Sequence, residues 1–165
     1  MPAPTPALPA EPVVEAYFGP LPVPAQYIPL QRNEARALYI GAAANIEATL
    51  EIARATEVNA VVLDLKESDG IKYASSVQLA IDSGSVKPAF NLNDVVSRLQ
   101  AEGLIVIGRI VCFKDPILAE ARPDLSIQDE GGKSLFFTNE GGKPFTSPYN
   151  QEVWQYNIDI AMEAI

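Results

Sequence analysis

The sequence predicts an α/β domain in which parallel β-strands alternate with α-helices. Three short apolar runs have the length of buried strands, and each is followed by a longer amphipathic segment with helical periodicity. In chain order, these runs and segments span residues 37–41, 45–57, 59–68, 91–103, 104–113 and 150–165. Strands that are apolar on both faces belong to parallel sheets covered by helices, which predicts either a doubly wound sheet or a (β/α)8 barrel. In both folds the carboxyl ends of the strands carry the functional site.

The first βα unit begins with ALYIG (37–41), an apolar run that ends in a glycine and is typical of a buried strand. The segment 45–57 follows it, and Asn45 is of a residue type favoured at helix N-caps. Apolar residues at helical spacing predict the face of this helix that packs on the sheet, namely Ile46, Leu50 and Ala53.

The second unit joins the run NAVVLDLKES (59–68) to the segment NLNDVVSRLQAEG (91–103). The first half of the run is β-branched and apolar, as expected of a central strand. Asn91 or Asn93 is expected to cap the helix, and Gly103 is placed at the C′ position. The inward face of this helix is predicted to hold Val95, Val96 and Leu99.

The third unit consists of LIVIGRIVCF (104–113) and NQEVWQYNIDIAMEAI (150–165). Gly108, in the middle of the strand, either lets a helix approach closely or marks a bulge, and packing is the favoured interpretation. The predicted apolar stripe of the helix consists of Trp154, Ile158, Ala161 and Ile165. This prediction places Trp154 in the core.

The amino-terminal segment differs from the rest of the chain. Nine of the fourteen prolines fall within the first 29 residues, a density that excludes a regular helix or a central strand. Residues 1–25 are therefore predicted to form a Pro/Ala-rich linker, and residues 26–165 the folded domain. The linker has neither the basic start nor the apolar centre of a signal peptide. Three βα units are fewer than the eight of a barrel, so we expect an incomplete domain, with an anchor or export signal in front of the linker.

Two long connections, 69–90 and 114–149, follow the second and third strands, and both far exceed ordinary βα loops in length. The tetrapeptide EGGK occurs twice in the second connection, which predicts a β-hairpin near residues 125–145. A phosphate-binding loop is not predicted, because the glycine that such a loop needs upstream of GGKS is absent. The hairpin's phenylalanines either form a platform for a sugar ring or, as the favoured interpretation, pin the hairpin to the domain; they are Phe136, Phe137 and Phe145.

Charged residues stand at the carboxyl ends of the second and third strands. Period-2 alternation places Asp64 and Lys66 on one face of the second strand, and Arg109 and Asp115 on the matching face of the third. Because isolated buried charges are costly, we expect these four groups to pair across adjacent strands. They either position a polar substrate or form a structural ion-pair network. Tyr149, in the loop before the last helix, is expected at the same end of the sheet.

The composition narrows the possible chemistry. The net charge of −9 argues against a nucleic-acid partner, and no run approaches the roughly 18 apolar residues of a transmembrane helix. The chain has no histidine, which removes Ser-His-Asp and Cys-His nucleophile systems and His-ligated metal sites. The single Cys112 is interpreted as a structural thiol. We predict no metal and no cofactor, and the lack of a G-x-G-x-x-G after the first strand disfavours a Rossmann-type nucleotide binder.

Several segments taken together resemble the DUF4015 family of bacterial glycoside hydrolases. The matching pieces, all within residues 37–165, are NAVVLDLKESDG, VIGRIVCFKDP, RPDLSI and SPYNQEVWQYNIDIAMEAI, in that order. The resemblance implies a (β/α)8 TIM barrel, a carbohydrate substrate and an extracytoplasmic or membrane-anchored location. It also implies a fourth strand, rich in acidic and aromatic residues, beyond the last helix. In barrel glycosidases the catalytic carboxylates lie on that strand and later ones.

The resemblance leads us to expect a glycoside hydrolase that acts on a polysaccharide or cell-wall glycan. We expect it here as an inactive amino-terminal part, with the carboxyl-terminal half of the barrel missing. Cations beside Asp64 and Asp115 favour ionised positioning groups over a general acid. The alternative is a non-catalytic carbohydrate- or cell-wall-binding module. Catalytic residues are unassigned, and substrate binding is predicted for Asp64, Lys66, Arg109, Asp115 and Tyr149.

Overall fold

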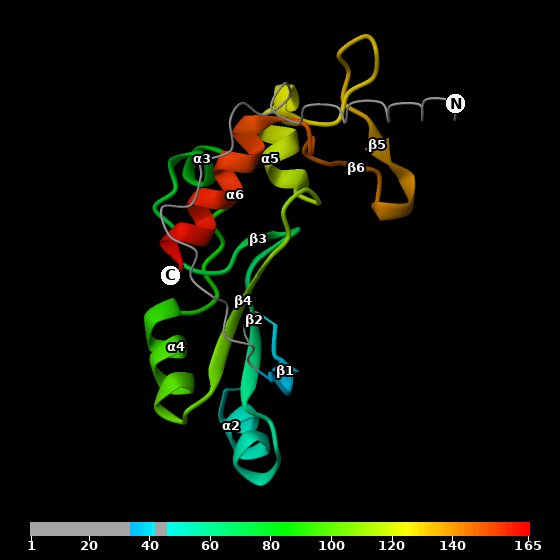
Figure 1. Cartoon of the computed structure of the whole chain (residues 1–165). Helices are drawn as coiled ribbons and strands as arrows, with labels where there is room; N and C mark the ends of the chain where they lie inside the picture. The colour runs from blue at the N-terminus through cyan, green and yellow to red at the C-terminus, as the bar shows by residue number, and fades with distance from the viewer. Residues whose placement is uncertain (1–33, 42–45) are drawn as a thin grey trace, which may run out of the picture. The chain divides into compact units, whose positions relative to one another are not determined.

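The computed structural model describes residues 34–41 and 46–165, and Figure 1 shows their arrangement. The predicted linker, residues 1–25, and the predicted cap Asn45 lie outside the described residues. The elements in chain order are β1 (Ala37–Tyr39), α2 (Ile46–Ala55), β2 (Ala60–Glu67), β3 (Gly70–Ile71), α3 (Gln78–Asp82), α4 (Leu92–Ala101), β4 (Ile105–Ile110), α5 (Pro116–Ala121), the 3-10 turn η1 (Pro123–Leu125), β5 (Phe136–Phe137), the 3-10 turn η2 (Thr138–Glu140), β6 (Lys143–Pro144) and α6 (Gln151–Glu163).

Strand β2 is the centre of the sheet and has β1 and β4 as parallel neighbours. Ala60 of β2 pairs with Ala37 on one side and with Ile105 on the other. The short β3 turns back antiparallel onto the carboxyl end of β2, where Ile71 pairs with Lys66. The predicted α/β class with parallel strands is therefore confirmed. The sheet formed by the described residues is open and does not close into a barrel.

The first two predicted helices are confirmed with shorter bounds. In α4 the Asn91 side chain accepts a hydrogen bond from the backbone N–H of Asp94 at 3.2 Å, so Asn91 is the cap. Gly103 ends the helix with a φ of +75°, a left-handed conformation that glycine adopts without strain. Of the residues predicted to face inward, Leu50, Val95 and Leu99 are buried, and Ile46 and Ala53 pack against the core. Val96 is only partly buried and does not belong to the core.

Gly108 shows why a small residue is needed in the middle of β4. A Cβ atom at this position would lie 2.5 Å from Cδ1 of Leu65 on the neighbouring strand β2. Leu65 is buried, and its side chain occupies the space that a larger residue at 108 would need. The close contact that requires a glycine at position 108 is therefore made by a side chain of the neighbouring strand and not, as predicted, by a helix.

The predicted stripe of the last helix is wrong. Trp154 is 42% exposed, and its indole N–H donates to the carbonyl of Pro148 at 2.6 Å instead of entering the core. Ile158 and Ile165 are also exposed. The buried face of α6 is rotated by about one residue, roughly 100° around the helix, and consists of Val153, Tyr156, Asn157 and Ile160.

Candidate substrate-binding site

The carboxyl ends of β1, β2 and β4 bring four polar side chains together. We call Tyr39, Asp64, Glu67 and Arg109 the Arg109 cluster. Arg109 lies opposite Asp64 in the β2–β4 register, and its Nη1 donates to Asp64 Oδ1 at 2.5 Å. The same nitrogen contacts a carboxylate oxygen of Glu67 and donates to the Tyr39 hydroxyl at 3.1 Å. Tyr39 in turn donates its own hydroxyl proton to Asp64 Oδ2.

Burial and exposure divide the Arg109 cluster into an inner and an outer part. Asp64 is 2% exposed and is satisfied on both oxygens, by Arg109 and by Tyr39. Arg109, Glu67 and the ring of Tyr39 reach solvent. The guanidinium carbon of Arg109 lies 5.6 Å from the centroid of the Tyr39 ring, within the range of a cation–π contact. A buried carboxylate thus holds an exposed cation and the hydroxyl of an exposed tyrosine in position.

The electrostatics of the Arg109 cluster favour a permanent cation. Hydrogen bonds to Asp64 and then Glu67 raise the pKa of Arg109, so its guanidinium stays charged. The hydrogen bond to Asp64 also raises the pKa of Tyr39, which keeps the phenol protonated. The cluster therefore combines a charged guanidinium with a neutral phenol.

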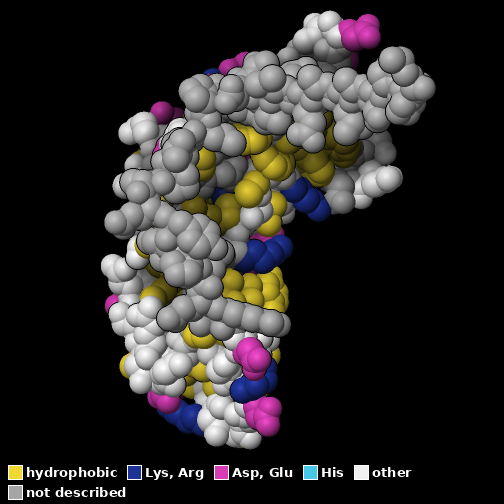
Figure 2. Space-filling model, viewed as in Figure 1, with side chains coloured by type: hydrophobic (Ala, Val, Ile, Leu, Met, Phe, Trp, Pro, Cys, Tyr) yellow, Lys and Arg dark blue, Asp and Glu magenta, His cyan; other side chains and the backbone are white. Residues whose placement is uncertain are grey.

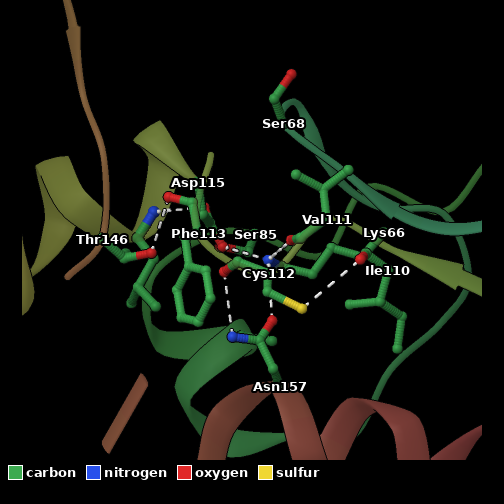
Figure 3. Close-up of polar contacts among 12 residues, drawn as sticks. Lys66, Ser68, Ser85, Ile110, Val111, Cys112, Phe113, Asp115, Thr146 and Asn157 are labelled. Carbon is green, nitrogen blue, oxygen red and sulfur yellow. Dashed lines mark hydrogen bonds and ion pairs between the residues drawn. The ribbon is translucent and has the colours of Figure 1, made fainter. Parts of the chain in front are cut away.

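A second group of polar side chains is buried beside the first. We call Lys66, Asp115 and Asn157 the Lys66 network, and Figure 3 shows it between the sheet and α6. Lys66 Nζ lies 2.8 Å from Asp115 Oδ2 and donates to the carbonyl of Val111 at 2.6 Å. Its ammonium group also lies 5.2 Å from the centroid of the Tyr156 ring. Lys66 is 0% exposed and Asp115 2%, which favours the structural alternative for these two residues.

The predicted pairing of the four charges is confirmed, as Asp64 with Arg109 and as Lys66 with Asp115. Their placement on a single face is wrong. The register between β2 and β4 shifts between Asp64 and Lys66, so the side-chain alternation does not continue to the end of β2. Strand β4 also ends at Ile110 rather than at residue 113, which takes Asp115 out of the strand.

Asp115 is instead the N-cap of α5, where its Oδ1 accepts from the backbone N–H of Leu118 at 3.0 Å. The shift in register has a second consequence, since Glu67 rather than Lys66 joins Asp64 beside Arg109.

Sequence reasoning missed Glu67 and Tyr39. Tyr39 could have been found from its position at the carboxyl end of the first strand. The side chain of Tyr149 is 89% exposed, and the backbone N–H of this residue donates to Ser147 Oγ at 3.3 Å.

Two buried tyrosines beside the Lys66 network predict a loss of stability in alkali. Burial raises the pKa of Tyr73 and of Tyr156 above the ordinary value of about 10, and the charges of Glu163 and Asp115 add to the effect. Above that pH the unfolded chain has lost these protons while the folded chain retains them, so the free energy of unfolding falls as pH rises.

We expect urea unfolding at pH 11 to show lower stability than at pH 8, and the absorbance of the two phenolates to appear only with unfolding. The Tyr156→Phe variant should show a smaller decrease between these two pH values. An equal decrease in the variant would contradict the assignment to Tyr156.

The described residues contain no group of three or more His, Cys, Asp or Glu side chains suited to holding a metal ion. Nor does any helix among them have the length and apolar character needed to cross a membrane.

The arrangement defines a class of protein: an α/β domain whose parallel strands present a polar, cation-centred site at their carboxyl ends. Residues 36–165 match DUF4015, a family described as "putative glycosyl hydrolase domain". The chain belongs to this family, as the resemblance of its sequence motifs predicted.

A solved structure and two curated proteins are also similar to this chain. A hypothetical protein from Ruminiclostridium thermocellum ATCC 27405 is 33% identical and superposes with a TM-score of 0.71, covering 77% of this chain and 69% of its own. The dehydrogenase/reductase SDR family member 4 proteins of Homo sapiens and Pongo abelii are each 28% identical over 113 residues. That match covers 64% of this chain and 41% of each of those proteins, so it spans less than half of their length.

Proposed function

We propose that this protein is the amino-terminal part of a glycoside hydrolase that acts on a polysaccharide or cell-wall glycan, and that the Arg109 cluster binds its sugar hydroxyls. The observation that carries the proposal is the cluster itself, which places an exposed guanidinium and phenol at the carboxyl ends of parallel strands. Membership of a glycosyl hydrolase family supports a carbohydrate ligand.

The complete fold that we propose is a (β/α)8 barrel. In such a barrel, strands that follow one another in the chain are neighbours in the sheet, all parallel and each followed by a helix. The order β1-β2-β4, with helices α2, α4 and α6, has this pattern for three successive units. A barrel would place Asp64 and Arg109 at its mouth, facing the substrate.

We assign a positioning role, rather than proton transfer, to the Arg109 cluster. Glycoside hydrolysis requires one carboxylic acid that gives a proton and a second carboxylate that acts as base or nucleophile. Asp64 and Glu67 both bind the same guanidinium nitrogen, and Asp64 also accepts a hydrogen bond from the Tyr39 hydroxyl, so both carboxylates are engaged within the cluster. We therefore place the proton donor and the nucleophile outside this cluster, in the remainder of the barrel. An extracytoplasmic location would bring the protein to such a glycan.

The Arg109→Ala variant tests this function. We expect the dissociation constant for soluble polysaccharide, measured by affinity electrophoresis, to rise about tenfold or more, because a hydrogen bond to a charged group contributes roughly 1.5–3 kcal/mol. Tyr39→Phe, which removes only the hydroxyl from a partly exposed ring, should weaken binding while preserving the fold.

The matched control is Arg54→Ala, which removes an exposed arginine paired with Glu102 near the amino ends of the strands. This variant should bind normally. Unchanged binding in folded Arg109→Ala and Tyr39→Phe proteins would overturn the assignment of the site. Glycan binding by a full-length protein that releases no reducing ends would favour the non-catalytic binding module.

A further inference from the structure

The second long connection carries a small β-hairpin with a fixed turn. Strands β5 and β6 are antiparallel, with Phe136 opposite Pro144 and Phe137 opposite Lys143. Gly141 and Gly142 have φ angles of +74° and +68°, a left-handed conformation that other residues rarely adopt. The backbone N–H of Gly142 donates to the carbonyl of Phe137 at 3.1 Å, which closes the turn.

A hollow of about 400 Å³ lies on this hairpin, a size within the range of small-ligand pockets. Two of its phenylalanines, Phe137 and Phe145, are stacked, with ring centroids 4.6 Å apart and planes 16° from parallel. Each of these two rings covers a face of the other, whereas the side chain of Phe136 is 56% exposed. The hollow combines aromatic rings with one hydroxyl and one amide, and its lining is Phe136, Phe137, Thr138, Asn139 and Phe145.

The chain that leaves the hairpin is bound to the segment that follows β4, the strand that bears Arg109. The backbone N–H and the hydroxyl of Thr146 both donate to the carbonyl of Phe113 at 3.0 Å, and Phe113 is four residues beyond Arg109. In Figure 1 the hairpin and β1 are drawn on the same side of β2 and β4, opposite α4. Figure 2 shows apolar and basic side chains next to each other along that side.

We propose that the hollow on the β5–β6 hairpin is a second sugar-binding subsite that takes one pyranose unit of the glycan held by the Arg109 cluster. The proposal rests on the proposed function. A pyranose with equatorial substituents presents a flat face of C–H groups and a rim of hydroxyls. The exposed Phe136 ring matches the apolar face, and Thr138 and Asn139 supply hydrogen-bond partners for the rim.

A subsite built on an exposed aromatic ring favours some polysaccharides over others. A polysaccharide of equatorially linked gluco- or xylo-configured sugars forms a flat, extended chain. One sugar unit can therefore lie on Phe136 while another reaches the strand ends. An axially linked chain such as amylose coils, so its successive rings face different directions. We therefore expect cellohexaose or xylohexaose to bind, and maltohexaose to bind more weakly.

Calorimetric titration of the whole chain with cellohexaose, xylohexaose and maltohexaose tests the subsite. Phe136→Ala should raise the dissociation constant for the preferred oligosaccharide about three- to tenfold, and Phe136→Trp should restore or strengthen binding. The matched control is Leu135→Ala, which removes a neighbouring exposed apolar side chain that does not line the hollow. Circular dichroism confirms that each variant is folded.

The outcomes separate this subsite from the Arg109 cluster. Weaker binding in Phe136→Ala with normal binding in Arg109→Ala would support the subsite and overturn the proposed function of the cluster. Normal binding in Phe136→Ala with weaker binding in Arg109→Ala would overturn the subsite alone. A change in sedimentation coefficient in Phe136→Ala without any change in sugar affinity would also overturn it, since the hairpin would then be a self-association surface.

Discussion

Replacing Lys66 with alanine is expected to lower the free energy of unfolding by about 3–5 kcal/mol, because removing one member of a buried ion pair leaves the other charged and unpaired. Lys66 and Asp115 are both buried, with Nζ and Oδ2 2.8 Å apart. The substitution also removes a hydrogen bond to the Val111 carbonyl and creates a cavity next to Tyr156. Urea unfolding followed by circular dichroism measures the change.

A double variant separates the charge from the packing. Lys66→Met with Asp115→Leu removes both charges and keeps most of the volume, so it should lose less stability than Lys66→Ala. Arg54→Ala breaks an exposed pair with Glu102 and should cost about 1 kcal/mol or less. If Lys66→Ala and Arg54→Ala cost the same, the buried pair does not hold this part of the fold together.

Replacing Gly70 with alanine is expected to destabilise the fold by about 2–4 kcal/mol, for two reasons that act together. Gly70 has a φ of +120°, which residues with a Cβ rarely adopt. A Cβ there would also lie 2.5 Å from the backbone oxygen of Ser85 and 2.8 Å from Cγ of Lys87. Because the nearest of these atoms belongs to the backbone, the collision cannot be relieved by turning a side chain.

Gly84→Ala provides a matched control for backbone strain. Gly84 also has a positive φ, of +70°, but a Cβ there would have open space around it. This variant should therefore lose only about 1–2 kcal/mol, the cost of the left-handed conformation. Thermal unfolding of both variants makes the comparison, and an equal loss in the two would show that the contact with Ser85 contributes nothing.

The sequence was sufficient to predict the alternation of strands and helices, since each unit carries its own local signals. Asn91 caps α4, Gly103 ends it, and Leu99 packs into the core as helical spacing requires. Asp64 and Arg109 were also placed together correctly, because both lie in regular strands with a continuous register. Local patterns were therefore reliable for these elements.

The last helix shows where such patterns are insufficient. It has two overlapping apolar stripes, one through Trp154 and Ile158 and one through Val153 and Ile160. Spacing alone cannot choose between them. The choice is made by Asn157, which donates to the carbonyl of Cys112 at 3.1 Å and lies 3.4 Å from Lys66 Nζ. Polar contacts with distant segments therefore decide which stripe is buried.

The site was only half predictable for a similar reason. Glu67 enters the Arg109 cluster because the register shifts after Asp64, and a shift of one position reverses the direction of every later side chain. Period-2 alternation contains no information about such a shift. Asp115 is likewise a helix cap rather than a strand residue, a role set by the short length of β4.

The carbonyl of Phe113 accepts hydrogen bonds from both the backbone N–H and the hydroxyl of Thr146. This contact affects which parts of the sequence can be altered without loss of the fold. It ties together two points 33 residues apart, and Asp115 anchors the chain just inside that tie through Lys66. The segment between these two points contains Leu118 and Leu125, which are buried in the core, and the hairpin turn at Gly141 and Gly142, which is exposed. The turn can be shortened, extended or exchanged while β4 and α6 stay where they are, so the ligand preference of the surface can be altered separately from the stability of the sheet.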